Sequence, residues 1–238
     1  MTDQEYKEWV WSKMALDHSE FPKRCDPFDD PWMVENLILN TGYIAWQPFA
    51  GANAMDVGAN VGIWGFHAAL HGANVTAYEA DPLTHAVLQQ TAKDLSIQNL
   101  TALNKAIWIF NGTTQFLGRD YEWKCRGRNG SLQSLEVSPS PVANEIECIT
   151  FDDAIGDVMW DCVKMDIEGA EFPVLENVST GKLSQIRTLH VEFHNSDRNQ
   201  PKYALLLKKL ASVFNVASHS INNEEFQGRY HWAQFSLK

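Results

Sequence analysis

Four residues between positions 54 and 81 have the types and spacing of a nucleoside-binding site: Asp56, Gly58, Gly62 and Glu79. Gly58 and Gly62 bracket a tight turn after a short apolar segment, and their missing β-carbons let a ligand approach the backbone closely. Glu79 ends the next apolar run, where a carboxylate can accept hydrogen bonds from both hydroxyls of a ribose. The stretch therefore predicts a strand, a glycine turn, a helix and a second strand that carries an acid at its tip.

The spacing of the glycines indicates which nucleoside is bound. Dinucleotide-binding proteins usually show G-x-G-x-x-G, whereas here Gly58 and Gly62 enclose three other residues, among them Ala59 and Asn60. Asn60 replaces the middle glycine that would let a pyrophosphate lie against the backbone, and Asp56 suits a ligand with an ammonium group. The pattern favours S-adenosylmethionine over NAD. A dinucleotide-dependent oxidoreductase and a non-catalytic cofactor-binding protein used for interaction stay open as alternatives.

A second set of polar residues follows two later apolar runs. Asp166 and Glu168 are two positions apart, as are Glu192 and His194, so each pair shares a face if its strand stays extended. Neighbouring strands would bring three carboxylates and an imidazole together, and methylation of a hydroxyl needs such a base. We expect His194 to be that base, with Asp166 as the second candidate.

Two other interpretations of this second set stay open. Crowded carboxylates can bind a cation, so the same four residues could hold a divalent metal ion: Asp166, Glu168, Glu192 and His194. Alternatively, Glu168 only caps the following helix, and His194 only forms hydrogen bonds with loop backbone. The sequence does not decide between these interpretations.

The strings MDVGANVG, YEAD, FDDAI, VKMDIEGAE and HVEFH occur in this order between residue 51 and the C-terminus. Together they resemble the FkbM family of S-adenosylmethionine-dependent methyltransferases. The resemblance implies that Asp56 anchors the methionine ammonium, that residues 58–62 lie against the methionine part, and that Glu79 accepts the ribose hydroxyls. It also implies hydroxyl groups of sugars, glycolipids or natural products as methyl acceptors, with S-adenosylhomocysteine as the second product.

The tips of the next strands complete the expected cofactor site. Ala80 would lie beside the adenine, Asn104 is the candidate for a hydrogen bond to it, and Ala106 follows at the same tip. The expected cofactor-binding set is Asp56, Gly58, Ala59, Asn60, Gly62, Glu79, Ala80, Asn104 and Ala106.

Motifs of other methyltransferase classes are missing. DIEG, at residues 166–169, stands where enzymes that methylate amino groups of bases commonly carry [DN]-P-P-[YFW]. The sequence has no Pro-Cys dipeptide for attack on a pyrimidine ring carbon. It also has no lysine between Gly169 and Gly181 to complete the Lys-Asp-Lys-Glu set of ribose methyltransferases. Transfer to an oxygen is therefore favoured.

Strand and helix patterns alternate from residue 51, which predicts an α/β fold with a doubly wound, mostly parallel sheet. The family resemblance implies a Rossmann-like class I methyltransferase sheet of seven strands, one of them antiparallel. Residues 100–107 are expected to form one strand, and the Asn111-Gly112 step predicts a hairpin that joins Ile107 to Phe116. Asp81 and Pro82 predict the start of a helix.

The chain divides into two regions of different character. Residues 1–50, rich in Trp, Pro and charge, predict a helical N-terminal extension, and residues 51–238 predict the methyltransferase domain. Residues 118–145 show little periodicity and contain several basic side chains, which predicts a long loop insertion.

Composition and charge limit the function further. The 238 residues are 45% hydrophobic and 21% charged, an ordinary balance for a globular protein. The net charge of −11 disfavours a grip on nucleic acid phosphates, which needs clustered basic residues. Four scattered cysteines, an acidic N-terminus and no apolar run of about 18 residues predict a cytoplasmic protein with no membrane segment.

Overall fold

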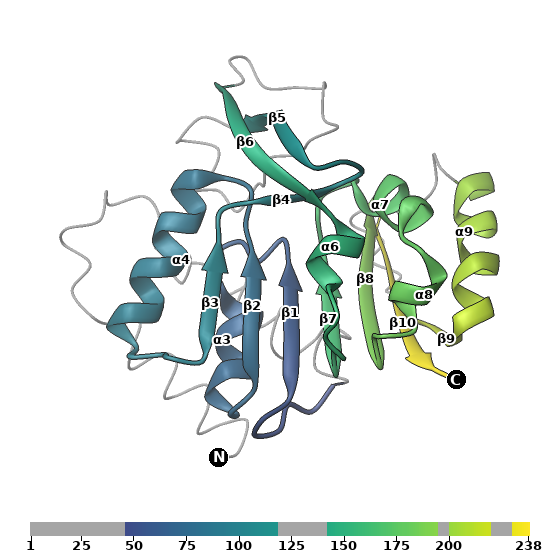
Figure 1. The fold of residues 1–238 in the computed structure, drawn as a ribbon, viewed down its shortest axis with the longest axis horizontal. Coiled ribbons are helices and arrows are strands. Elements are labelled where there is room, and N and C mark those ends of the chain that lie inside the picture. Colours follow the sequence, from purple (N-terminus) through teal and green to yellow (C-terminus); the bar gives the residue numbers. More distant parts are fainter. Residues whose placement is uncertain (1–45, 119–141, 195–199, 220–229) are drawn as a thin grey trace.

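The computed structural model describes residues 46–118, 142–194, 200–219 and 230–238. Seven strands form its central sheet: β1 (Asn53–Val57), β2 (Asn74–Tyr78), β3 (Leu100–Leu103), β7 (Cys162–Met165), β8 (Thr188–His194), β9 (Phe214–His219) and β10 (Tyr230–Leu237). Their order across the sheet is β3-β2-β1-β7-β8-β10-β9 (Figure 1). β10 is antiparallel to β8 and β9, and the other pairings of the sheet are parallel. The expected α/β fold with one antiparallel strand is confirmed.

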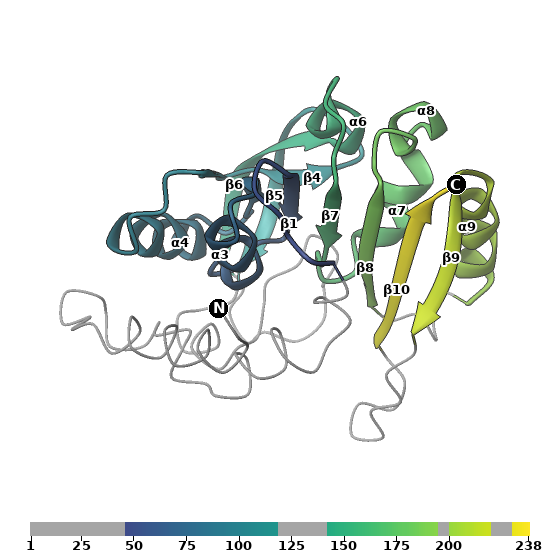
Figure 2. The same ribbon diagram turned by 90° about the horizontal axis from the view of Figure 1, so that it is seen from below.

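Helices cover both faces of this sheet, as a doubly wound fold requires (Figure 2). α3 (Ile63–Leu70) and α4 (Pro82–Asp94) pack on one face, where Phe66 and Leu88 belong to one buried apolar cluster with Ala77 of β2. The other face carries α6 (Phe151–Ile155), α7 (Glu171–Asn177), α8 (Thr180–Leu183) and α9 (Gln200–Val213). There Phe172 of α7 and Leu210 of α9 join the largest apolar core.

A smaller sheet lies beyond the carboxyl ends of β1, β2 and β3 (Figure 1). It consists of β4 (Ala106–Trp108), β5 (Gly112–Gly118) and β6 (Val142–Thr150) in the order β4-β6-β5. Its buried side chains pack against Ala80, the residue that follows the acidic tip of β2. The small sheet thus forms a wall at the edge where ligands bind in open α/β sheets.

The single strand expected over residues 100–107 is wrong. The chain leaves the large sheet after Leu103, and β4 begins at Ala106 in the small sheet. Asn104 lies at this break, and its side-chain amide donates to the backbone oxygens of Glu79 and Ala80. These bonds fix the chain at the tip of β2. The apolar run of residues 100–107 is therefore divided between two sheets.

The hairpin expected at Asn111-Gly112 is also wrong. β4 and β5 do not pair with each other, because β6 inserts between them, parallel to β4 and antiparallel to β5. The Asn111 side chain accepts the Thr150 N–H and donates to Asp153, so it contacts the segment that follows β6. The Asn-Gly step indicated a reversal of the chain, but β4 and β5 each pair with β6, which comes later in the sequence.

Other expectations fall partly outside the described residues. Gly118 belongs to β5 and residues 142–145 belong to β6, so the expected loop insertion is shorter than 118–145. Residues 119–141 of that loop and residues 1–45 of the expected N-terminal extension lie outside the description. The start of α4 is confirmed: Pro82 is its first residue, and the Asp81 carboxylate accepts the Thr84 N–H.

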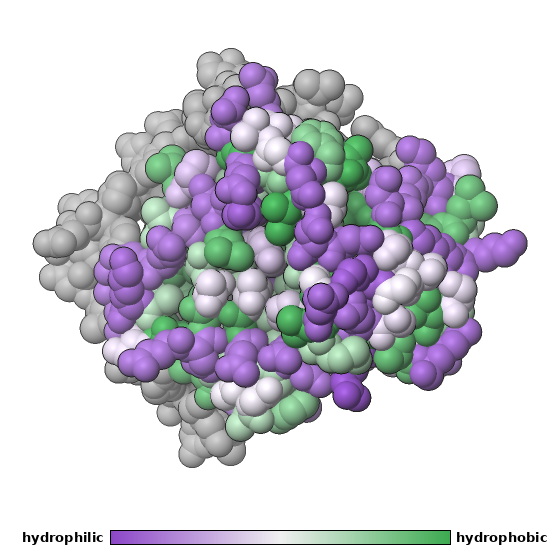
Figure 3. All heavy atoms as spheres, viewed as in Figure 1, coloured by the Kyte–Doolittle hydropathy of each residue, from purple (hydrophilic) through white to green (hydrophobic). Residues whose placement is uncertain are grey.

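Hydrophilic and hydrophobic residues are interspersed over the face of the molecule that Figure 3 shows. Exposed large apolar side chains include Leu83 on α4 and Leu205 on α9, which belong to different parts of the fold. Within the described residues, no helix combines the length and the apolar character that a membrane crossing needs. Scattered exposed side chains of this kind are normal for a folded surface.

Lys209 on α9 stabilises the end of α7. Its Nζ atom donates to the backbone oxygens of Leu175, Glu176 and Val178 at 3.0, 2.8 and 2.6 Å. We predict that Lys209→Met lowers the free energy of unfolding by about 2 kcal/mol, because these helix-end carbonyls lose a charged donor. Urea denaturation measures the change.

The neighbouring exposed Lys208 supplies the matched control. Lys208→Met removes the same charge from the same helix and is expected to change stability by less than about 0.5 kcal/mol. Equal losses in the two variants would show that the contacts of Lys209 with α7 contribute nothing specific.

Candidate active site

The glycine turn joins the end of β1 to the start of α3, at the carboxyl edge of the large sheet. Gly58, Asn60 and Gly62 have positive φ values of 77°, 52° and 93°. A β-carbon on Gly58 would lie 1.8 Å from the backbone oxygen of Asp166, so only glycine fits there. The turn therefore touches the end of β7, at the switch point where the sheet extends from β1 in two directions.

Asp56 and Lys164 form a buried ion pair beneath this turn. The Asp56 Oδ1 and Lys164 Nζ atoms are 3.2 Å apart. Asp56 Oδ2 also accepts the Gly65 N–H, which ties β1 to the first turn of α3. Burial raises the pKa of Asp56, while the charge of Lys164 opposes that shift. The geometry differs from the expected contact of Asp56 with a cofactor ammonium, because a fully buried carboxylate presents no surface to a ligand.

Lys164 is a residue of this site that the sequence patterns did not indicate. Its Nζ atom donates to the backbone oxygen of Gly58 at 2.7 Å and lies 3.8 Å from Asp166 Oδ2. Burial lowers the pKa of Lys164, but the charges of Asp56 and Asp166 outweigh burial and raise it, so the side chain stays cationic. The one signal in the sequence was a lysine inside the apolar run VKM.

Glu79 lies at the end of β2, facing the turn. Its Oε2 atom accepts the Asn60 N–H at 2.7 Å, and its Oε1 atom accepts the Asp81 N–H at 2.8 Å. Burial raises the pKa of Glu79 to about 7, although both backbone bonds favour the carboxylate. Each carboxylate oxygen has two lone pairs, so this pattern of bonds leaves acceptor capacity for ribose hydroxyls.

The remaining expected cofactor residues line the same edge. Asn104 uses its amide nitrogen to hold the Glu79 and Ala80 carbonyls, so only its side-chain oxygen could accept a bond from an adenine amino group. Ala59 and Ala106 are buried, the first in the turn and the second in β4. These two alanines shape the walls and offer no polar side-chain contact.

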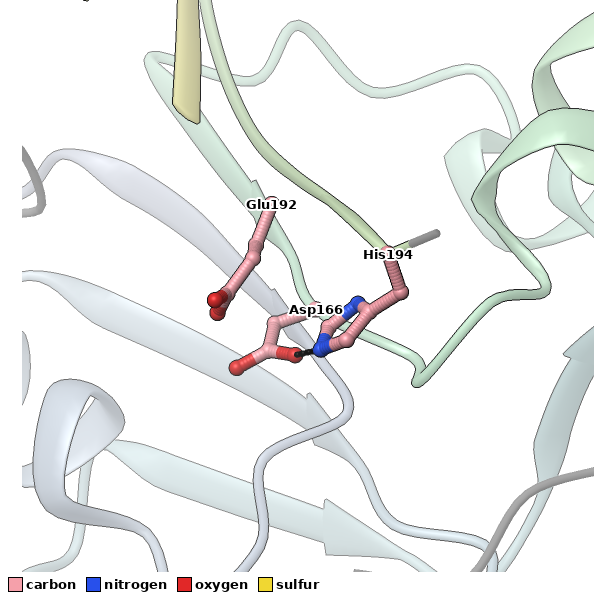
Figure 4. Close-up of side chains that lie close together, drawn as sticks. All are labelled: Asp166, Glu192 and His194. Atoms are coloured by element: carbon pink, nitrogen blue, oxygen red, sulfur yellow. Dashed lines mark ion pairs between the residues drawn. The ribbon is translucent and has the colours of Figure 1, made fainter. Parts of the chain in front are cut away.

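The second set of polar residues comes together as expected, because β7 and β8 are neighbours. His194 Nε2 lies 3.4 Å from Glu168 Oε2 and 3.8 Å from Asp166 Oδ1. Figure 4 shows Asp166, Glu192 and His194 pointing toward one another from the ends of the two strands. Strand alternation does not place Glu168 in this cluster, because β7 ends at Met165. Glu168 lies in the turn that follows and has a positive φ of 54°.

Glu171 is a second residue that the sequence patterns did not indicate. Its buried carboxylate accepts the N–H groups of Ile167 and Gly169, and its Oε1 atom lies 3.0 Å from His194 Nδ1. Glu171 thus holds the turn before α7 through these two backbone N–H groups. An acid in the first turn of a helix, directly after DIEGA, was the available signal.

The carboxylates set the charge of the imidazole. Burial lowers the pKa of His194, but the charges of Glu171, Glu168 and Glu192 raise it well above its usual range. Burial also raises the pKa of Glu192 well above its usual range, and the nearby Asp166 charge adds to that effect. The surrounding carboxylates therefore favour the protonated form of His194.

The same atoms could bind a divalent ion. One oxygen from Asp166, one from Glu192 and one ring nitrogen of His194 lie within 4.8 Å of one another, which suits a mixed oxygen and nitrogen site. Glu168, the fourth expected ligand, lies beside them at 3.4 Å from His194. An ion at this place would bind His194 in its unprotonated form, so metal binding would release the imidazole proton.

Comparison with solved structures places the fold among methyltransferases. A protein from Clostridium thermocellum, provisionally described as an rRNA methylase, has a TM-score of 0.51 at 11% identity, covering 82% of this chain and 91% of that chain. A dimethyladenosine transferase from Plasmodium falciparum scores 0.49 at 11% identity, covering 88% and 62%. A precorrin-6y C5,15-methyltransferase from Geobacter metallireducens GS-15 scores 0.45 at 10% identity, covering 82% and 85%. At such identities the likeness shows the Rossmann-like class I fold alone.

Sequence families give a more specific result. A search of curated proteins finds no matching sequence. The family model described as the methyltransferase FkbM domain, however, matches residues 56–218, from the acid before the glycine turn to the last but one strand. That match covers more than half of the chain and favours methyl transfer over the oxidoreductase that the sequence left open. The chain belongs to the FkbM methyltransferase family and is an S-adenosylmethionine-dependent methyltransferase.

Proposed function

We propose that the enzyme methylates a hydroxyl oxygen of a sugar, glycolipid or natural-product-type small molecule, with His194 as general base. The observation that carries this proposal is the fixed orientation of the imidazole. Glu171 meets Nδ1 at 3.0 Å, while Nε2 faces Asp166 and Glu168. A base held by a buried carboxylate on one nitrogen is a recurring arrangement for proton transfer at the other.

The residues at the glycine turn fit an adenosyl group. Glu79 presents a carboxylate whose oxygens each hold one backbone N–H and can accept a ribose hydroxyl. Asn104 presents a side-chain oxygen from the adjoining tip. The methionine part then lies along residues 58–62, toward Asp166 and His194. When bound, S-adenosylmethionine supplies an activated methyl group and leaves as S-adenosylhomocysteine.

The protein's part in the reaction is to align the acceptor and remove its proton. His194 in its neutral form accepts the hydroxyl proton at Nε2. Glu171 keeps the ring in the tautomer with a proton on Nδ1 and stabilises the imidazolium that forms. Asp166 and Glu168 lie near Nε2 and can accept hydrogen bonds from other hydroxyls of the acceptor.

RNA is the competing acceptor, since the similar structure from Clostridium thermocellum is described as an rRNA methylase. The charge of this site argues against it. Asp166 and Glu168 lie beside Nε2 of His194, the proposed base, and carboxylates repel a phosphate backbone. The net charge of −11 gives no compensating attraction over the whole chain.

We predict that the enzyme transfers label from carbon-13 methyl-labelled S-adenosylmethionine to sugars or polyhydroxylated natural products, and not to total RNA. The chemical shift of the transferred methyl carbon identifies the bonded atom, and an oxygen is expected. The screen is run with and without exhaustive chelation, and turnover is expected to persist, because the proposed base is the side chain of His194 and needs no metal-bound water. Label on RNA alone, or on nitrogen, would contradict the proposal.

We predict that adenosine binding weakens about tenfold between pH 8 and pH 6, because the carboxylate of Glu79 is the ribose acceptor and its pKa is about 7. Protonation removes the charge that the hydroxyls bind, so affinity is lost as pH falls through 7. Calorimetric titration with adenosine measures the affinity at each pH. Glu79→Gln should bind weakly at both pH values, whereas the exposed control Glu176→Gln should keep the wild-type pH dependence. Equal wild-type affinities at pH 6 and pH 8 would exclude this role.

We predict that kcat/KM for the acceptor rises with pH above 7, since the neutral imidazole is the base and the pKa of His194 is raised. Glu171→Gln removes the largest charge that raises this pKa, so the rising limb should move to lower pH by at least about one unit. His194→Gln should lower kcat by about 100-fold or more.

Affinity for S-adenosylhomocysteine serves as the check on folding in these two variants and should change little. If Glu171→Gln leaves the pH profile of kcat/KM unchanged, another group is the base, and Asp166 is the next candidate.

A further inference from the structure

The ammonium group of Lys164 meets acceptors from two different parts of the active site. Its Nζ atom lies 2.7 Å from the Gly58 oxygen, 3.2 Å from Asp56 Oδ1 and 3.8 Å from Asp166 Oδ2. Gly58 opens the cofactor turn directly after β1, whereas Asp166 is the first residue after β7. An ammonium has three donors, so one side chain can serve all of these groups.

The strand register dictates this meeting. Lys164 on β7 is paired directly with Asp56 on β1, so the two side chains stand beside each other on the same face of the sheet. Both are buried, and an unpaired charge at such a place would be strongly unfavourable. Neutralising Asp56 requires one contact only. The contacts with Gly58 and Asp166 lie further along the strands, at the edge where the ligand binds.

The turn and β7 are also in direct backbone contact at this point. The space where a β-carbon of Gly58 would lie is filled by the Asp166 backbone oxygen. The Gly58 N–H and Ala59 N–H both bond to Tyr78 on β2, so the amide side of the turn is held from one neighbouring strand. Lys164 holds the carbonyl side from the other neighbouring strand.

We propose that Lys164 is a positioning residue that fixes the Gly58 carbonyl against Asp166 and thereby shapes the subsite for the methionine part of the cofactor. Lys164 itself does not touch the cofactor. The adenosine subsite is formed by Glu79 and Asn104. The charge of Lys164 lowers the pKa of Glu79 less than burial raises it, so the two subsites are compared at pH 9, where Glu79 is ionised with or without this ammonium. The inference rests on the proposed function in assigning residues 58–62 to the methionine part.

The test removes Lys164 in a background where Asp56 no longer needs a charge partner. Asp56→Asn keeps an oxygen that can accept the Gly65 N–H and is the reference. D56N/K164M then removes the ammonium without leaving a buried carboxylate alone. Calorimetry with S-adenosylhomocysteine and, separately, with adenosine measures the two subsites, and thermal unfolding reports the stability of each variant.

The proposal predicts that D56N/K164M binds S-adenosylhomocysteine at least about tenfold more weakly than D56N, while adenosine affinity changes by less than about twofold. Equal weakening of both ligands would overturn it, since that would indicate general loosening of the fold. Unchanged affinity for both would also overturn it, because Lys164 would then serve only as the charge partner of Asp56.

A third variant guards against a failure to fold. D56N/K164Q keeps an N–H donor near the Gly58 carbonyl and should bind S-adenosylhomocysteine at least about threefold more tightly than D56N/K164M. If neither double variant folds while D56N does, Lys164 is required for the fold as a whole and the proposal fails. Failure of the proposed function has a different signature, since label on RNA or nitrogen, or full turnover by His194→Gln, would leave the difference between the two ligands in D56N/K164M unchanged.

Discussion

The buried charge of Lys164 is the constraint on which the active site depends. An ammonium in the interior must be paired, and here Asp56, the Gly58 carbonyl and Asp166 supply its partners. Those partners sit on β1, on the turn after β1 and on the end of β7. The pairing therefore holds together the two strands at the switch point of the sheet, which is where a class I methyltransferase binds its cofactor. The lack of space for a β-carbon at Gly58 shows that the turn after β1 and the end of β7 are in close contact.

The next pair of strands, β7 and β8, positions the imidazole of His194. β8 lies beside β7, and His194 at its end enters a cluster of carboxylates whose innermost member, Glu171, also caps the turn before α7. One buried acid thus holds the backbone and orients the imidazole that we propose as the base. The raised pKa of His194 is the electrostatic consequence, because each carboxylate nearby favours the imidazolium. A site rich in acids suits hydroxylated acceptors and disfavours anionic ones.

Much of this could be predicted from the sequence because the signals were local. Glycine spacing indicated the turn, and strand alternation indicated that β7 and β8 would present Asp166 and His194 together. The failures were cases where distant segments decided the outcome. Asn111-Gly112 indicated a reversal of the chain between β4 and β5. Both of these strands pair instead with β6, which lies about 30 residues later in the sequence. Lys164 in an apolar run and Glu171 in a first helical turn were visible as unusual residues, but nothing local shows that their side chains will contact Gly58 and His194.

The account makes one central claim: the methyl donor binds over the glycine turn with its reactive end toward the carboxylates and His194. A crystal structure of the wild-type enzyme with S-adenosylhomocysteine tests this most directly. We expect the ribose hydroxyls on Glu79, the methionine part along residues 58–62 and the sulfur on the side of Asp166 and His194. A nucleoside bound away from Glu79, or a sulfur directed away from His194, would contradict the account.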